Sequence, residues 1–319
     1  MPGRERAVAL TLAALGLALA VISPAFFTVS NARDLLLANL PVLIVALGAL
    51  LVILTGEIDI SCGSMFAVCS VVAGMAATST GSPVVALVAA SVAGLALGAF
   101  NGVLVAYGRI PSIVATLAAM VALRDGLRWA TGGAWITDMP RTFQWFGVAQ
   151  RGYPAIAGGI ALLLCVAMAW ALRHSTVGRW IYAVGSNAAA ARLAGIRVER
   201  VKCAVFAAAG LLTAIAAVLN AARFNQVPSN SGIGLEMRVI AAVVVGGAAV
   251  TGGAGTLRGT LLGVALLGMI GPGLTFLGVT AYWERALHGV IVLAAVTFDA
   301  WRMRVPPPAT VVDAAVSSP

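Results

Sequence analysis

Long apolar runs recur from one end of the chain to the other, and they constrain its fold more than any other feature. The runs are about 15 to 23 residues long, and a helix needs about 20 residues to cross the hydrocarbon core of a bilayer. Only 10% of the residues are charged, whereas soluble domains carry about 25%. The sequence therefore predicts an all-α, polytopic bundle of transmembrane helices and excludes an ordinary soluble core.

The spacing of the runs predicts about ten spans. The first follows Arg4 and Arg6 and exceeds the h-region of a signal peptide, which spans about 7–15 residues, so we expect a retained helix. The fifth begins at Pro111 and loses its apolar character after Leu123, so it is short, tilted or carries charges into a protein-lined cavity. The expected spans are residues 8–27, 35–54, 63–78, 84–106, 111–123, 154–172, 203–222, about 235–250, 256–278 and 283–301.

Ten spans place both termini on one side of the membrane. If that side is cytoplasmic, 12 of the 20 Lys and Arg residues lie there, in the direction of the positive-inside rule. Five spans in each half would make the two halves a possible inverted repeat. We therefore expect residues 1–302 to form a single transmembrane domain. Residues 303–319 contain three consecutive prolines and are expected to form a disordered C-terminal tail.

Residues 173–202 are the polar exception between two apolar blocks. They hold six of the 20 Lys and Arg residues, including the only lysine, Lys202. Glycines at 185 and 195 are expected to bound a short helix whose alanines form a contact face. We interpret residues 173–202 as a cytoplasmic coupling segment, at which a separate protein binds the bundle and moves it. The alternative is a solvated helix at the membrane surface.

A second polar stretch, residues 55–61, interrupts the apolar pattern, and we call it the polar knot. Its charged residues, Glu57 and Asp59, need an interface, a partner or water, because a lone charge at mid-bilayer costs roughly 2.5–3.5 kcal/mol. Either Asp59 or Ser61 caps the helix that begins near Gly63, or the knot lines a substrate path. Other polar residues at or near span interiors are Asn101, Thr116, Arg124, Asp125, Glu236 and Arg238.

Glycines spaced four residues apart mark two of the expected spans. One stripe consists of Gly94, Gly98 and Gly102. The other consists of Gly255, Gly259 and Gly263. This spacing puts small residues on one helix face and lets helix backbones approach closely, so both stripes predict tight helix packing.

Several kinds of chemistry are disfavoured by the residues available. No Ser/His/Asp or Cys/His set stands out, and the sole lysine is not part of a phosphate-binding loop. Cys62 and Cys69 have no His or carboxylate that would complete a metal site, and the basic residues sit in short loops, which disfavours nucleic acid. No loop is long enough for an energy-supplying domain. The sequence therefore indicates a transport pathway whose energy is supplied by another protein. One rival hypothesis is a stand-alone secondary transporter or channel for a small polar solute, and the other is a membrane-embedded enzyme.

Four stretches carry a resemblance to a known family, the membrane permease subunits of bacterial ABC importers for monosaccharides of the ribose, xylose, arabinose and rhamnose type. The knot resembles the signature LTGGIDLSVGS, and its GEIDIS form is most similar to the rhamnose branch. The others resemble an N-G…P-x-I-x-T-L…R-G-L pattern, a GR-x-x-YA-x-G-x-N-x-x-AA-x-x-x-GI segment and an E-x-x-x-IAAVV-x-GG…GG-x-GT-x-x-GT-x-x-G block. The stretches are Leu50–Gly74, Gly98–Leu127, Gly178–Lys202 and Leu235–Gly263.

The chain departs from the family pattern at a few positions. Glu57 stands where many members have glycine, and Asp125 replaces the usual glycine after Arg124. Ala188 to Ala190 replace the acidic or proline residues that often follow the asparagine.

The resemblance implies a complex of two permeases and two ATPases in the bacterial inner membrane, fed by a periplasmic sugar-binding protein. The second permease would be an identical chain or a paralogue, and lipid would surround both. ATP–Mg would bind the ATPase, so that this chain binds no cofactor or metal and is not an enzyme. The implied ATPase-coupling residues are Arg179, Tyr182, Gly185, Asn187, Ala191, Arg192 and Gly195. The residues implied in the translocation path, or in the knot as a structural element, are Glu57, Asp59, Ser61, Asn101, Thr116 and Glu236.

Overall fold

The computed structural model describes residues 2–224 and 226–280, together with single residues at 283, 286, 289–290 and 293. Over this part of the chain the protein is helical, and its one β-bridge joins Ile136 to Val227. The elements are α1 (Pro2–Ile22), the 3-10 turn η1 (Pro24–Phe27), α2 (Val29–Leu54), α3 (Cys62–Thr80), α4 (Pro83–Ala106), α5 (Ser112–Thr131), the 3-10 turn η2 (Gln144–Gly147), α6 (Tyr153–His174), α7 (Thr176–Ser186), α8 (Ala188–Leu193), α9 (Val198–Ala221), α10 (Leu235–Val245) and α11 (Leu257–Phe276).

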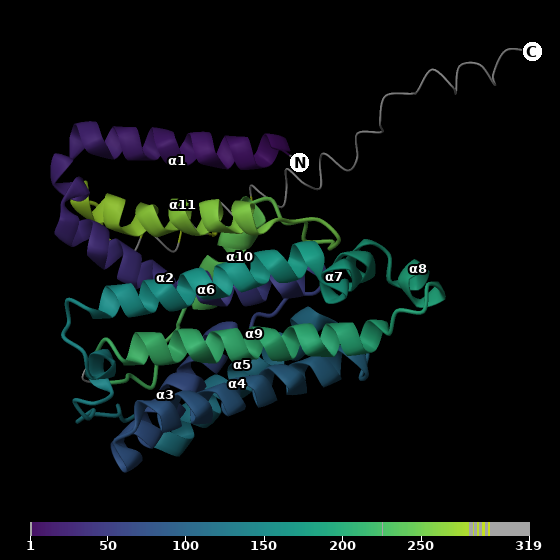
Figure 1. Cartoon of the computed structure of the whole chain (residues 1–319), viewed down its shortest axis with the longest axis horizontal. Helices are drawn as coiled ribbons and strands as arrows, with labels where there is room; N and C mark the ends of the chain where they lie inside the picture. The colour runs from purple at the N-terminus through teal and green to yellow at the C-terminus, as the bar shows by residue number, and fades with distance from the viewer. Residues whose placement is uncertain are drawn as a thin grey trace, which may run out of the picture.

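The all-α prediction is confirmed for the described residues. Seven of the helices, α1, α2, α3, α4, α6, α9 and α11, are long and apolar enough to cross a membrane. Figure 1 shows the long helices lying side by side, with α7 and α8 together at one end of the bundle and the N-terminus at that same end.

Ten complete spans stay a prediction. The fifth expected span forms α5, but its second half carries Arg124, Asp125 and Arg128, so it is less apolar than the seven. The eighth forms α10, whose 11 residues rise only about 16 Å. The tenth expected span and the expected tail at 303–319 fall outside the described residues, apart from the single positions given above.

The first span differs from the expectation of one unbroken helix over residues 8–27. α1 ends at Ile22, and Ser23 has a non-helical backbone with φ −140° and ψ 79° before the turn at Pro24. The ring of a proline disfavours the α conformation in the residue before it. Pro24 therefore ends the helix inside an otherwise apolar run.

α2 is the central helix of the bundle. Every side chain from Ile44 to Leu54 is buried, because α2 packs against α6, α9, α10 and α11. A helix that is apolar on all sides is buried on all sides. Its C-terminal end leads directly into the polar knot.

The first glycine stripe forms a seam between α4 and α9, which we call the α4–α9 seam. A Cβ at Gly94 would collide with the carbonyl of Gly210, and one at Gly98 would collide with the carbonyl of Phe206. At Gly102 a Cβ would lie 2.8 Å from Cα of Cys203. The prediction that this stripe lets two helix backbones approach closely is confirmed.

The second stripe packs α11 against α10. Cβ atoms at Gly259 and Gly263 would collide with the carbonyls of Gly246 and Ala242. Gly255 lies just before α11, where it packs against Ala248. Tight packing is therefore confirmed for the two helical members of the stripe, and the third belongs to the preceding loop.

Hydrogen bonds distinguish the two ends of the bundle. At the end that holds α7 and α8, the Tyr182 hydroxyl donates to the carbonyl of Gly255 at 2.9 Å, and Thr256 Oγ1 donates to Glu5 of α1 at 2.5 Å. At the opposite end, Thr142 Oγ1 donates to the carbonyl of Gly81 at 2.6 Å. The first two of these bonds join α7 and the start of α1 to the residues just before α11. We call this side of the bundle the α7–α8 end.

Candidate functional site

The polar segment after α6 folds into two short helices, each with a side-chain cap. Ser175 Oγ accepts from the backbone N–H of Gly178 at 3.0 Å and starts α7, while Asn187 Oδ1 accepts from that of Ala190 at 3.0 Å and starts α8. Gly185 lies inside α7, so the expectation that it ends a helix is wrong: Asn187, which is extended, makes the break. Gly195 follows α8 with φ +80°, as expected for the residue after a helix.

The exposed face of α8 includes Ala189 and Ala190 of the expected alanine face, but it does not include Ala191. Ala191 is buried inside the chain, whereas Leu193 is 92% exposed. Arg192 turns back toward α9, where its Nη2 atom forms an ion pair with Glu199 Oε1 at 2.6 Å. The alanine that was expected to make an external contact therefore holds α8 to the bundle, and the surface that remains open centres on Leu193.

Four glycines join α7 to the rest of the molecule, and we call this contact the glycine junction: Gly56, Gly185, Gly252 and Gly253. A Cβ at Gly185 would collide with the carbonyl oxygen of Leu54, the last residue of α2, and would lie 2.6 Å from the nitrogen of Gly253. That nitrogen donates to the Leu54 carbonyl at 3.0 Å. At Gly185 the end of α2, the C-terminal part of α7 and the loop before α11 therefore meet through backbone atoms.

Two further coupling candidates, Tyr182 and Arg179, lie on α7 and form hydrogen bonds. Tyr182 is half-buried and donates to the loop before α11, as described above. Burial raises the pKa of Tyr182 above its usual value, so its hydroxyl remains a donor at neutral pH. Arg179 is exposed and donates to Thr176 Oγ1 at 3.0 Å and to the carbonyl of His174 at 3.4 Å, where it satisfies the C-terminal end of α6.

The polar knot is held by a hydrogen-bonded chain of side chains. Asp59 Oδ1 accepts from the backbone N–H of Ser61 at 2.9 Å and from its hydroxyl at 2.6 Å. Asn101 of α4 then donates to Ser61 Oγ at 2.8 Å. Ser61 stands at the N-cap of α3 but makes no side-chain cap bond, because its hydroxyl donates to Asp59. Of the two residues expected to cap the helix, Asp59 or Ser61, Ser61 therefore does not do so.

Hydroxyl groups of α5 satisfy the backbone of the knot. Thr116 Oγ1 accepts from the N–H of Ile60 at 3.1 Å, and Ser112 Oγ accepts from that of Ile58 at 3.2 Å. Burial raises the pKa of Asp59 above its usual value. The second carboxylate oxygen of Asp59 has no hydrogen-bond partner among the described residues.

Glu236 also lies beside the knot, in the first turn of α10. Its Oε1 atom accepts from the N–H of Gly234 at 3.2 Å. A Cβ at Gly63 would collide with its other carboxylate oxygen, so the carboxylate packs directly against the start of α3. The structure thus gathers Asp59, Ser61, Asn101, Thr116 and Glu236 in one region.

An ion pair links the knot to the coupling segment. Lys202 Nζ pairs with Glu57 Oε1, and the two side chains are only 21% and 13% exposed. The pair borders a polar cavity of about 670 Å³, also lined by Arg109, Arg192 and Glu199. In the sequence Lys202 stands out only as the sole lysine, and no local pattern pairs it with a residue 145 positions away.

The described residues contain no group of three or more His, Cys, Asp or Glu side chains that could hold a metal ion. Cys62 and Cys69 are buried free thiols. The chemistry of the region is therefore that of hydrogen bonds, one buried carboxylate and two ion pairs.

Comparison with known proteins gives a consistent result. The family model described as "Branched-chain amino acid transport system / permease component" matches residues 31–296. The chain is 38% identical over 283 residues to the ribose import permease protein RbsC of Escherichia coli (strain K12), covering 87% of this chain and 88% of the relative. It is 34% identical over 296 residues to the autoinducer 2 import system permease protein LsrC of Yersinia pseudotuberculosis serotype O:1b (strain IP 31758), covering 93% and 84%. No solved structure matches the chain.

Proposed function

The chain belongs to the family of permease components of branched-chain amino acid transport systems, and on this premise we propose that it is the permease subunit of an ATP-driven importer of a simple sugar in the bacterial inner membrane. Its seven long apolar helices suit a multi-pass membrane protein. The relative named as a ribose import permease supports a sugar as the substrate class, as does the sequence resemblance to monosaccharide permeases.

We propose the ten-span topology with both termini in the cytoplasm. Basic residues support this orientation, because the α7–α8 end holds more of them than the opposite end and cytoplasmic loops are enriched in Lys and Arg. The N-terminus also lies at the α7–α8 end (Figure 1). Those at the α7–α8 end are Arg4, Arg6, Arg109, Arg173, Arg179, Arg192, Arg197, Arg200, Lys202 and Arg258, and those at the opposite end are Arg33, Arg124, Arg128, Arg141, Arg151 and Arg223. Arg238 lies between the two ends, beside Asn39 of α2.

The glycine junction is the observation that carries the proposed coupling role. α8 projects from the end of the bundle (Figure 1), and α7 contacts the end of the central helix α2 through backbone atoms. Because Gly185 meets the Leu54 carbonyl and the nitrogen of Gly253 without a side chain of its own, a push on α8 reaches α2 and the loop before α11 through this contact. An ATPase that binds α8 around Leu193 therefore has a rigid handle on the bundle.

The polar knot takes a structural role in this proposal. Its hydroxyl, amide and backbone groups are hydrogen-bonded to one another and to α4 and α5. Lys202 ties Glu57 to α9, directly behind the coupling segment. The knot then transmits movement of the α7–α8 end to α4 and α5 rather than contacting the sugar.

The partners follow from the family. They are an ABC ATPase that binds ATP–Mg, a periplasmic sugar-binding protein and a second permease chain, identical or paralogous. With hydrolysis on the ATPase, this chain supplies the path and the handle, and it is not itself an enzyme.

Reconstitution in liposomes tests the proposal against a stand-alone transporter. Uptake of radiolabelled ribose and rhamnose is measured with the permease alone, and then with the ATPase and the cognate binding protein plus internal ATP. Uptake only in the complete system is expected. Equal uptake by the permease alone, driven by the sugar gradient or by a proton or sodium gradient, would overturn the proposal.

A further inference from the structure

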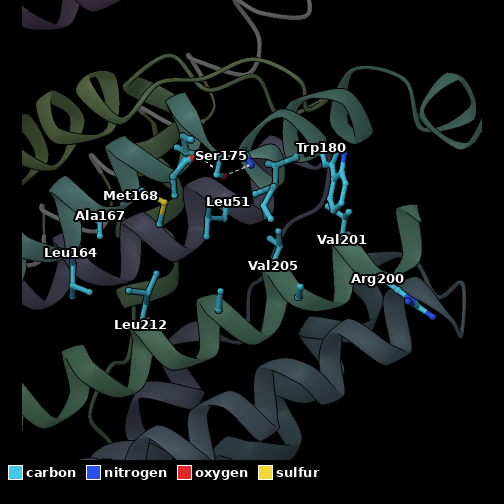
Figure 2. Close-up of a pocket in the computed structure, with 17 residues that line it drawn as sticks. Leu51, Leu164, Ala167, Met168, Ser175, Trp180, Arg200, Val201, Val205 and Leu212 are labelled. Carbon is cyan, nitrogen blue, oxygen red and sulfur yellow. Dashed lines mark hydrogen bonds between the residues drawn. The ribbon is translucent and has the colours of Figure 1, made fainter. Parts of the chain in front are cut away.

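An apolar groove runs along the outer side of the bundle between α6 and α9. Both helices pack against α2, which supplies Leu51 as the floor of the groove, and small side chains such as Ala208 leave the space between them open. The cavity holds about 480 Å³ and is lined almost entirely by carbon. Figure 2 shows Leu164 and Leu212 toward one end of the groove and Trp180 and Arg200 toward the other.

The length of the groove matches one leaflet of a bilayer. On α9 it extends from Arg200 to Leu212, which is about 18 Å at 1.5 Å per residue. Half of the hydrocarbon core is about 15 Å thick. The groove therefore spans one leaflet, on the side of the α7–α8 end.

The two ends of the groove differ in chemistry as the two ends of a phospholipid do. Trp180 is 41% exposed, and tryptophan favours the headgroup level of a membrane. Arg200 is exposed, and its guanidinium points away from the apolar end (Figure 2). It is not part of either ion pair recorded among the described residues. Glu199, the adjacent acid, is engaged by Arg192. The headgroup end is therefore positive, and basic pockets between transmembrane helices bind anionic lipid headgroups.

The shape of the groove favours a hydrocarbon chain over a helix of a second permease copy as the occupant. A helix with its side chains is about 10 Å wide, so a second copy would lie over the groove and place only side chains in it. A single hydrocarbon chain is thin enough to follow it from Arg200 to Leu212.

We infer that this groove is a binding site for an anionic phospholipid, with one acyl chain between α6 and α9 and the phosphate at Arg200 beside Trp180. The site requires only that α6 and α9 lie in a membrane, so it does not depend on the proposed sugar or on the coupling role. Bound lipid would fill the gap beside α7 and fix the position of α6 relative to α9.

Native mass spectrometry of the detergent-purified chain tests the site. The probes are phosphatidylglycerol and phosphatidylcholine with identical acyl chains, and glycerol phosphate as a headgroup without chains. We expect one phosphatidylglycerol to be retained at least fivefold more often than phosphatidylcholine, and glycerol phosphate not to be retained. Equal retention of the two lipids would overturn the anionic site, and retention of glycerol phosphate alone would show that the groove takes no part.

Five variants locate the lipid. Ala208→Phe fills the groove and should abolish retention, and Ala204→Phe, at an exposed position of the same lining, repeats the test if the first variant folds poorly. Ala169→Phe, exposed on α6 outside the lining, should behave like the wild type. Arg200→Gln should lower phosphatidylglycerol to the level of phosphatidylcholine, whereas Arg258→Gln should not.

Two outcomes would contradict the inference. Unchanged retention in both groove-filling variants would place the lipid elsewhere. A groove-filling variant that separates a permease dimer, with lipid retention unchanged, would assign the groove to the contact between two copies.

Discussion

Glycine serves two different contacts in this molecule, the α4–α9 seam and the glycine junction. In the seam, glycines on α4 meet the backbone of α9 deep in the bundle, over a long stretch of both helices. In the junction, Gly185 meets the end of α2 and the loop before α11 at the edge of the bundle. Both contacts need the missing Cβ, but only the seam lies between two long helices.

The difference indicates what each contact contributes. Closely packed helices in a membrane are stabilised by van der Waals contact over their length, so the seam holds the fold together. The junction involves few residues, so we expect it to add less stability than the seam. It offers instead a contact without intervening side chains, which suits transmission of movement, and variants in the two places should separate folding from coupling.

A variant in the seam should have the largest effect. Gly98→Leu inserts a side chain where even a Cβ would collide with the carbonyl of Phe206, and we expect a loss of about 3 kcal/mol or more in stability. Yield of monodisperse protein and thermal unfolding in detergent measure it. Gly159→Leu, where a Cβ meets nothing within 4 Å, is the control. Similar behaviour of the two variants would contradict the assignment of the seam.

Gly185→Ala should leave the fold largely intact and disturb function. A Cβ there collides with the Leu54 carbonyl, so α7 must move away from α2 while the packed spans remain. We expect a melting temperature close to the wild type and a loss of at least tenfold in sugar uptake by the complete system. Gly126→Ala, with open space around its Cβ, is the matched control. Unfolding of Gly185→Ala as severe as that of Gly98→Leu would remove the distinction between the contacts.

The exposed tip of α8 tests whether a partner binds there. Leu193→Asp changes a side chain that contacts little of its own chain, so the stability of the permease should not change. We expect the affinity for the ATPase to fall about tenfold, measured by co-purification across a dilution series. Ala189→Asp, at another exposed position of α8, is the matched control, because it adds the same charge and keeps the leucine. Wild-type affinity of Leu193→Asp would place the ATPase contact elsewhere.

The ion pair between Glu57 and Lys202 should have a smaller effect. Lys202→Met leaves Glu57 partly buried without its partner, and Glu57→Gln has the converse effect. Because both side chains retain some exposure, we expect a coupling energy of about 1 kcal/mol in a double-mutant cycle. Thermal unfolding and uptake are both measured. Additive effects of the two changes would show that the pair does not connect the knot to α9.

Asp59→Asn should have the smallest effect, and its sign depends on pH. The amide oxygen can still accept from the N–H and hydroxyl of Ser61, so the knot should persist. Because burial raises the pKa of Asp59 in the folded protein, the native carboxylate loses stability as pH rises from its unfolded pKa through its folded pKa. The asparagine variant should therefore gain stability relative to the wild type with rising pH, measured by melting temperature from pH 4 to 8. The opposite trend would show that the ionised form is stabilised.

The sequence predicted much of the fold because apolar runs and glycine spacing are local patterns. Helix packing at Gly94, Gly98 and Gly102 followed from a four-residue period alone. The ends of α1 and α7 were predicted less well, because one proline and one asparagine overrode an apolar run and a nearby glycine. Asn187 carried a recognisable signal, since an asparagine before a short alanine run favours a helix N-cap.

The site was predicted only in part, because its contacts join residues far apart in the chain. The knot residues were identified as a group from their polarity, yet their partners Ser112 and Lys202 were not. No local pattern shows that Ala191 is buried or that Gly185 packs against Leu54, since α7 and α8 acquire their surroundings only when α2 and the loop before α11 are in place. These contacts require the tertiary structure.

The most direct test of coupling through the glycine junction is the number of sugar molecules imported per ATP hydrolysed, measured in liposomes that hold the permease, the ATPase and the binding protein. For Gly185→Ala we predict that ATP hydrolysis continues while this ratio falls at least tenfold, and that Gly126→Ala keeps the ratio of the wild type. A ratio unchanged in Gly185→Ala would contradict transmission of movement from α7 to α2.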